Sequence, residues 1–208
     1  MVKVMARSKF KDALNALNSI YDVAIPLFAE SGYSGVSMRQ VAQSVGISIA
    51  TLYHHFTDKQ TLYLRCIEES FSSKAKLMSE NLGSEGSIEE QLSRFVESFT
   101  VMMSEDENFR RLLQRELLDA DEKRLEILAK EVFQIQFKEV TDLAKRMAPD
   151  CDPHMMAISI VGLVLFHLET TPIRAFLPMG RQEHNEPKLV ASHVVKLLLN
   201  GISKCSTE

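Results

Sequence analysis

The stretch of sequence that decides the fold is residues 37–56, which read SMRQVAQSVGISIATLYHHF. Ser37 is a residue type that caps helix N-termini, and the apolar residues after it keep helical spacing as far as Val45. Gly46 supplies a turn, and Ser48 can cap a second short helix that runs to about Phe56. The stretch therefore predicts two short helices joined by a tight turn.

The two helices divide into an apolar inside and an outward face. The inside comprises Val41, Ala42, Val45, Ile47, Leu52 and Phe56. In a helix-turn-helix, the first helix braces the second, whose N-terminal residues reach base edges in the major groove. Short, hydroxylic and aromatic side chains suit such contacts. The outward residues are of these kinds: Ser48, Ile49, Ala50, Thr51, Tyr53, His54 and His55.

A further helix is expected after the cap formed by Thr57 and Asp58, beginning at Lys59. At that position the lysine charge and the free backbone N–H groups of the helix can meet a phosphate together.

The rest of the chain keeps helical spacing and shows no alternation of the kind that predicts strands. Pro26 should kink the first helix, and Gly32 should end it. We predict an all-α fold, with a three-helix head at residues 1–64 and a larger helical body at residues 65–208. The expected helices cover residues 10–31, 38–45, 48–56, 59–81, 87–104, 105–120, 121–147, 153–169 and 187–202.

Composition indicates an ordinary globular chain. The protein has 208 residues, of which 45% are hydrophobic and 25% charged, which excludes a disordered or fibrous chain. Its three cysteines are widely spaced, as expected in a reducing cytoplasm. The most apolar run, residues 155–168, is too short for a bilayer, which needs about 20 residues. No targeting segment is visible, so we expect a cytoplasmic protein without a membrane partner.

The net charge is −4, but the charge is unevenly distributed. Residues 1–66 hold seven basic and four acidic residues, which leaves 17 basic and 24 acidic residues in the remainder. A basic end on an acidic body is typical of a protein that touches phosphate at one end. Ordinary variation of the surface could give the same difference, so charge alone leaves both interpretations open.

Residues 28–63, FAESGYSGVSMRQVAQSVGISIATLYHHFTDKQTLY, resemble the N-terminal module of the tetracycline-repressor (TetR) family of bacterial transcription regulators. The resemblance covers about residues 10–65. It implies a homodimer with two DNA-binding heads on a near-palindromic double-stranded operator. It also implies a C-terminal body that binds a small-molecule effector and then releases DNA.

The resemblance also implies roles for individual residues. Ser37 and Arg39 would approach DNA, and Ile49, Ala50 and His54 would face bases. Thr51, Tyr53, His55 and Lys59 would hold the phosphate backbone. Position 49 is often polar or basic in the family and position 50 is often Gly or Pro. Ile49 and Ala50 therefore offer apolar contact only, for example to a thymine methyl group.

Two segments of the body predict dimerisation. The helix at 153–169 is apolar on nearly every face and therefore needs cover on all sides. The helix at 187–202 adds a second apolar face, made of Leu189, Val190, Val194, Leu197 and Leu198. A second copy would supply that cover, and two-fold proteins suit two-fold operators. A monomeric core remains the alternative.

Glu116 and His167 lie among apolar neighbours, and buried polar groups need partners. In one interpretation, Glu116 pairs with Arg94, Arg115 or another basic residue of the body. In the other, both residues line a pocket for a small, mostly apolar effector with one polar group. The candidate pocket residues are Phe95, Phe99, Met103, Phe109, Leu113, Glu116, Phe133, Phe137, Met156 and His167.

No nucleophile, phosphate-binding loop, dinucleotide or metalloprotease motif is present, so we predict no catalytic residues and no cofactor. No metal is expected either. His54 and His55 are adjacent and point about 100° apart on a helix, and Cys151 and His154 have no further ligand nearby in sequence. We predict a ligand-responsive DNA-binding repressor. The alternative is a small-molecule carrier or enzyme with a vestigial head.

Overall fold

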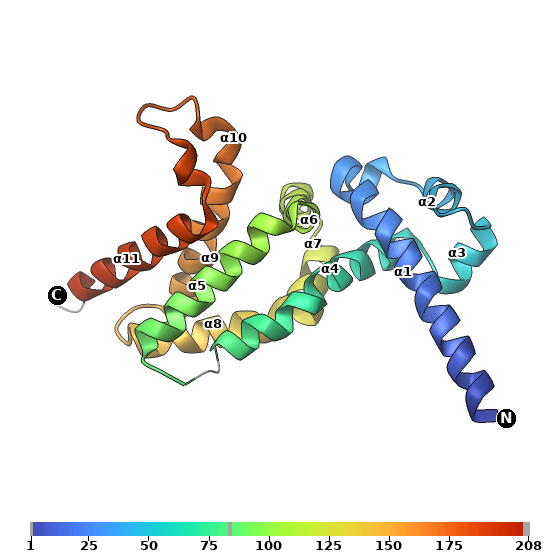
Figure 1. The fold of residues 1–208 in the computed structure, drawn as a ribbon, viewed down its shortest axis with the longest axis horizontal. Helices are drawn as coiled ribbons and strands as arrows, with labels where there is room; N and C mark the ends of the chain where they lie inside the picture. The colour runs from blue at the N-terminus through green and yellow to red at the C-terminus, as the bar shows by residue number, and fades with distance from the viewer. Residues whose placement is uncertain (1, 83–84, 206–208) are drawn as a thin grey trace. The chain divides into compact units, whose positions relative to one another are not determined.

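The computed structural model describes residues 2–82 and 85–205, and no β-strand occurs among them (Figure 1). The all-α prediction is confirmed. No helix in the described part of the chain is long and apolar enough to cross a membrane. The α-helices are α1 (Val2–Gly35), α2 (Met38–Val45), α3 (Ile49–His55), α4 (Lys59–Leu82), α5 (Ile88–Glu105), α6 (Glu107–Asp119), α7 (Glu122–Ile127), α8 (Gln134–Met147), α9 (Pro153–Glu169), α10 (Thr171–Arg174) and α11 (Pro187–Cys205). A π-helix, η1 (Leu128–Phe133), and a 3-10 helix, η2 (Gln182–Asn185), complete them.

The chain forms two compact units. The first contains the residues up to Ser72 together with Asn108–Leu128, and the second contains Ser73–Glu107 together with the residues from Ala129 onward. Helices α6 and α7 therefore belong with α1, α2 and α3, although α5 precedes them in sequence.

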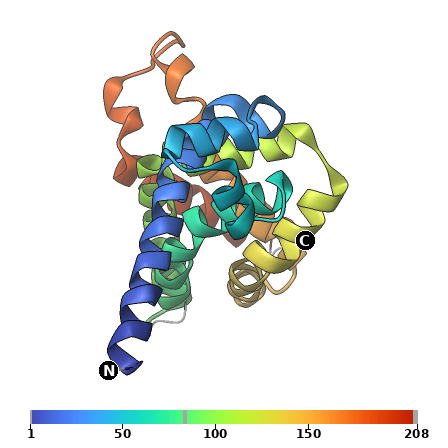
Figure 2. The ribbon, with the colours of Figure 1, turned by 90° about the vertical axis from the view of Figure 1, so that its right-hand side faces the viewer.

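The core of the first unit is built from aromatic and aliphatic side chains of α1, α3 and α4. Phe28, Leu52 and Tyr63 are fully buried. The Phe28 and Tyr63 rings meet edge to face with centroids 5.0 Å apart, and this pairing favours one arrangement of α1 and α4. Figure 2 shows α2 and α3 beside α1, against which α2 packs.

Helix α1 is interrupted near its end by Gly32, whose φ of 71° lies in the left-handed region. Pro26 lies inside the helix, so the non-helical backbone occurs at Gly32 and not at the proline. Arg115 of α6 donates its Nε–H to the Ala29 carbonyl at 2.9 Å and an Nη2–H to the Glu30 carbonyl. A basic side chain thus satisfies carbonyl groups freed by the break.

The second unit is a packed set of α5, α8, α9 and α11. Its core includes the fully buried Phe95, Met103, Leu143, Ile160 and Val194. The single helix expected over residues 121–147 is instead α7, η1 and α8 in succession. A π-helical turn holds more residues than an α-helical one, so η1 changes the faces that α7 and α8 present relative to an unbroken helix.

Candidate DNA-binding site

The two helices of the head begin at the serine caps expected from sequence. The Ser37 hydroxyl accepts the N–H of Gln40 at 3.2 Å, and the Ser48 hydroxyl accepts the N–H of Thr51 at 3.0 Å. The hydroxyls of Ser48 and Thr51 are also hydrogen-bonded, at 2.8 Å. Each cap satisfies a backbone donor that a short helix would otherwise leave free, so both helices have defined starts.

Gly46 ends α2 and makes the turn into α3. Its φ of 81° is left-handed, and its N–H donates to the carbonyls of Ala42 and Gln43 at 3.0 and 3.2 Å. A Cβ at this position would meet nothing within 4 Å, so backbone conformation rather than crowding favours glycine here.

Helix α3 presents most of its surface to solvent. Leu52 is its only buried residue, and it anchors the helix against the core. Ile49 is 39% exposed and Tyr53 is 50% exposed. Ala50, Thr51 and His54 are also exposed, and His55 is half-buried. A protruding helix with apolar, hydroxyl and imidazole groups is suited to contact with base edges and phosphates.

A surface hollow of about 570 Å³ lies where the start of α2 faces α3. It is lined by Ser37, Arg39, Ile49, Tyr53 and Lys59, together with Ser34, Gly35, Val36, Met38 and Gln40. The structure therefore brings five of the predicted DNA-contacting residues to one concave surface. The remaining ones, Ser48, Ala50, Thr51, His54 and His55, lie on α3 or at its cap outside this lining.

Lys59 has internal partners that its sequence position did not reveal. Its Nζ donates to the carbonyls of Tyr33 and Val36 at 2.9 and 3.0 Å and lies 4.2 Å from the centroid of the Tyr33 ring. An ammonium group has three N–H donors, so one remains for a phosphate. The lysine thereby ties the end of α1 to the start of α4.

Asp58 accepts a hydrogen bond from one of the backbone N–H groups at the start of α4. Its Oδ1 accepts the Thr61 N–H at 2.7 Å. Hydrogen bonds from the Thr61 backbone and side chain lower the pKa of Asp58, and a bond from Thr57 adds to them. The backbone donors predicted to meet a phosphate with Lys59 are thus partly satisfied within the protein.

The ten candidate effector-pocket residues are divided between the two units. Phe109, Leu113 and Glu116 lie on α6 in the first unit, where the Phe109 ring stacks on Phe71 at 5.6 Å. The others lie in the second unit, where Phe95 stacks on Phe99 with centroids 5.7 Å apart. Met103 is buried there, Phe133 and Met156 are half-buried, Phe137 contacts His154, and His167 contacts His193.

Glu116 has a basic partner, Arg124, which differs from the two arginines named from sequence. The Arg124 Nε–H donates to the carboxylate at 2.9 Å, and the exposed fractions of the two side chains are 8% and 0%. Burial lowers the pKa of Arg124, but the hydrogen bond and charge of Glu116, with the Asp121 charge, raise it overall. This pairing favours the structural interpretation of Glu116. No sequence pattern marks Arg124 as its partner.

Two family descriptions match the sequence. "Bacterial regulatory proteins, tetR family" matches residues 20–66, and "HTH-type transcriptional dual regulator CecR, C-terminal domain" matches residues 88–202. The first match spans the end of α1 through α3 and into α4, and the second spans α5 to α11.

Individual relatives agree with these matches. The biofilm operon icaADBC negative transcriptional regulator IcaR of Staphylococcus epidermidis is 29% identical over 161 residues, which cover 76% of this chain and 83% of that protein. The transcriptional repressor AcnR of Corynebacterium glutamicum is 36% identical over 67 residues, covering 32% of this chain and 36% of that one.

A solved structure supports the fold. The transcriptional regulator FadR of Bacillus subtilis, in complex with stearoyl-CoA, superposes with a TM-score of 0.73 at 17% identity, covering 88% of this chain and 98% of that one. The capped helices, the exposed α3 surface and the family matches lead to one conclusion. The chain belongs to the TetR family of bacterial regulatory proteins, has a C-terminal domain of the CecR type, and is a DNA-binding transcriptional regulator.

Proposed function

We propose that the protein is a homodimeric repressor that binds a near-palindromic operator in the cytoplasm through the α2–α3 surface. In this proposal residues 1–64 read DNA, and residues 65–208 form the dimer and receive a small effector. The observation that carries it is the exposed face of α3, which begins at a capped N-terminus beside the hollow containing Arg39 and Lys59. Base edges are read from the N-terminal end of such a helix.

The contacts within this surface have separate roles in the proposal. Ile49, Ala50 and His54 face bases, where apolar contact with thymine methyl groups suits the first two. Thr51, Tyr53, His55 and Lys59 hold phosphates, and Ser37, Ser48 and Arg39 approach the backbone beside them. None of these roles needs a metal or a cofactor, and we propose no catalytic activity.

Dimerisation is proposed through α9 and α11 of the second unit. Ile158 and Leu197 are each 49% exposed, and Phe166 is 72% exposed. Val194 is buried within the unit and so belongs to its core. The exposed side chains lie on two neighbouring helices. Covering them with a second copy would stabilise the dimer by about 25 cal/mol for each Å² of apolar surface buried. A two-fold pair of heads then matches two half-sites.

Effector binding is proposed to weaken DNA binding. The FadR relative was solved with stearoyl-CoA, a long apolar chain on a polar group, which supports a mostly apolar effector. The candidate residues for such a site in the second unit remain Phe95, Phe99, Met103, Phe133, Phe137, Met156 and His167. A coupling of about 1–3 kcal/mol would lower operator affinity roughly 5–150-fold.

The proposal is tested by selecting bound sequences from a pool of random DNA duplexes with the full chain. We expect an enriched motif with two-fold symmetry. Selected duplex is then titrated in the presence of apolar acids, amines and neutral compounds, while the melting temperature is followed in parallel. A compound that raises the melting temperature and weakens DNA binding supports the effector role. A pool without an enriched motif would contradict the DNA-binding role and favour a carrier with a vestigial head.

A further inference from the structure

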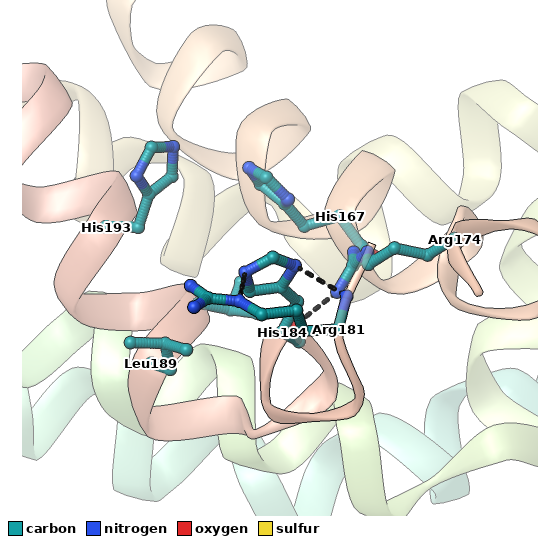
Figure 3. A pocket seen from close by; sticks show the side chains of 7 residues that line it. His167, Arg174, Arg181, His184, Leu189 and His193 are labelled. Carbon is teal, nitrogen blue, oxygen red and sulfur yellow. Dashed lines mark hydrogen bonds between the residues drawn. The ribbon is translucent and has the colours of Figure 1, made fainter. Parts of the chain in front are cut away.

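A second hollow lies in the second unit, apart from all but one of the candidate pocket residues. It has a volume of about 350 Å³ and is formed where the ends of α9 and α10 meet η2 and the start of α11 (Figure 3). Its lining is rich in basic side chains: His167, Arg174, Arg181, His184, Leu189, Val190 and His193. Only His167 was expected near a ligand from sequence.

Arg174 stands at this hollow with its charge uncompensated. Its Nη1 donates to the His184 carbonyl and to Asn185 Oδ1 at 3.2 Å. Its Nη2 donates to the His167 carbonyl and to Thr170 Oγ1 at 3.4 Å. All four acceptors are neutral, and no carboxylate among the described residues pairs with this guanidinium. These bonds fix its position and leave its positive charge for a ligand.

A tight connection just before Arg181 brings the backbone back against the Arg174 carbonyl group. A Cβ at Gly180 would collide with the Arg174 carbonyl oxygen, so glycine is needed for this approach. Arg181 donates its backbone N–H to His184 Nδ1 and its Nε–H to His184 Nε2, both at 3.3 Å. A neutral imidazole has one acceptor nitrogen, so it can accept only one of these two bonds at a time.

The carboxylate that pairs with Arg181 belongs to Glu183, which does not line the hollow. Glu183 Oε2 is 3.6 Å from Arg181 Nε, and both side chains are well exposed. Such a pair is weak in water. An anion that enters the hollow can therefore compete with Glu183 for Arg181, and it meets the charge of Arg174 without competition from a carboxylate among the described residues.

The opposite wall is apolar and aromatic. Leu189 and Val190 contribute aliphatic surface, and the rings of His167 and His193 meet edge to face with centroids 5.4 Å apart. Burial, His193 and Arg174 together lower the pKa of His167, which favours its neutral form. No group of three metal-binding side chains occurs in the described part of the chain.

We propose that this hollow binds a small organic carboxylate, with its charged group at Arg174 and Arg181 and its apolar body against Leu189, Val190 and the paired rings of His167 and His193. A guanidinium suits a carboxylate because its two Nη groups can donate parallel charge-assisted hydrogen bonds, and the Nη groups of Arg181 can serve this role. Arg174, whose Nη groups already donate to four neutral acceptors, adds its positive charge. The volume lies at the low end of ligand pockets, which span roughly 300–1,000 Å³. Binding requires no DNA, and only the assignment of this ligand as an effector rests on the proposed function.

The test is calorimetric titration of the full chain with benzoate, and with benzamide as a neutral compound of nearly the same shape. We expect benzoate to bind and benzamide to bind at least about tenfold more weakly, since charged hydrogen bonds are the stronger ones. Arg181→Gln should weaken benzoate binding about tenfold. Lys188→Gln is the matched control, because it removes one positive charge from an exposed position of α11 outside the hollow.

Several results would contradict the carboxylate site without bearing on DNA binding. Equal binding of benzoate and benzamide, equal losses in Arg181→Gln and Lys188→Gln, or no benzoate binding by the wild type would each overturn the carboxylate site. His193→Gln replaces one aromatic side chain of the lining without changing the arginines. It should weaken the binding of benzoate and benzamide by the same factor. Operator binding is measured separately on the same samples. Benzoate binding without operator binding would contradict the proposed function alone, and operator binding without benzoate binding would contradict this inference alone.

Discussion

Arg124 and Glu116 form an ion pair that is closed off from solvent, with Nε 2.9 Å from the carboxylate oxygen. The same guanidinium lies 4.4 Å from the centroid of the Tyr33 ring. Lys59 Nζ lies 4.2 Å from that centroid. One aromatic ring at the end of α1 thus contacts both the α6–α7 segment, through Arg124, and the start of α4, through Lys59. We infer that the pair helps to hold the head in one geometry.

Removing the carboxylate should therefore be costly. Glu116→Ala leaves the buried Arg124 charge without its main partner and should lower the free energy of unfolding by about 3–5 kcal/mol. The double variant Glu116→Leu with Arg124→Met should recover much of the lost free energy of unfolding, because no buried charge remains. Urea unfolding at neutral pH measures both. The exposed Glu122→Ala serves as control, and a cost for Glu116→Ala no larger than the control's would contradict the structural role.

The sequence predicted the parts of the fold that depend on local signals. Ser37, Gly46 and Ser48 mark caps and a turn whose chemistry is contained in a few neighbouring residues, and these elements lie within a residue of their predicted bounds. The helix over 153–169 was likewise predictable, since Asp152 caps it and Pro153 begins it.

Other features depend on residues that are distant in sequence. Gly32 was expected to end the first helix, and the backbone breaks there and not at Pro26. That Arg115 of α6 satisfies the freed carbonyl groups could not be predicted from neighbouring residues. The π-helix at 128–133 depends on packing that periodicity does not encode. Arg174 and Arg181 line the same hollow through a loop whose tight turn at Gly180 is evident only in three dimensions.

Stability in acid should depend on Asp58. Its pKa is lowered in the folded protein, so its contribution is present above the ordinary value of 3.8 and is lost as the pH falls through the lowered pKa. Asp58→Ala should therefore be less stable than the wild type at neutral pH, and the gap should close in acid. Urea midpoints measured between about pH 2 and pH 7 check this. A gap that stays constant over that range would show that the charge of Asp58 does not contribute.

The role of Lys59 can be separated from its internal bonds by salt dependence. Lys59→Ala should reduce the slope of log affinity against log salt by roughly 0.9, because one phosphate contact is lost. Ser37→Ala removes a cap without changing charge, and should lower affinity while keeping the slope. Operator titrations between about 50 and 200 mM salt measure both. An unchanged slope in Lys59→Ala would assign this lysine to the structure of the head alone.

Dimerisation should be sensitive to charge on the exposed faces of α9 and α11. Leu197→Glu should shift the protein toward monomer and abolish tight operator binding, because a single head loses the second half-site. Leu118→Glu makes the same change at a residue of α6 that is 77% exposed, and should leave the dimer intact. Sedimentation velocity distinguishes them. A monomeric wild type, or a dimeric Leu197→Glu variant, would contradict the proposed interface.

The most direct test of DNA recognition by the α2–α3 surface is fluorescence anisotropy with a selected operator duplex and two variants. Ala50→Glu places a negative charge at the exposed start of α3 without removing any internal contact. Gln114→Glu adds the same charge at an exposed position of α6. We predict that Ala50→Glu weakens binding at least about 100-fold, since like charges brought together cost several kcal/mol, while its melting temperature stays that of the wild type. Gln114→Glu should bind as the wild type does, and equal affinities for all three proteins would contradict the account.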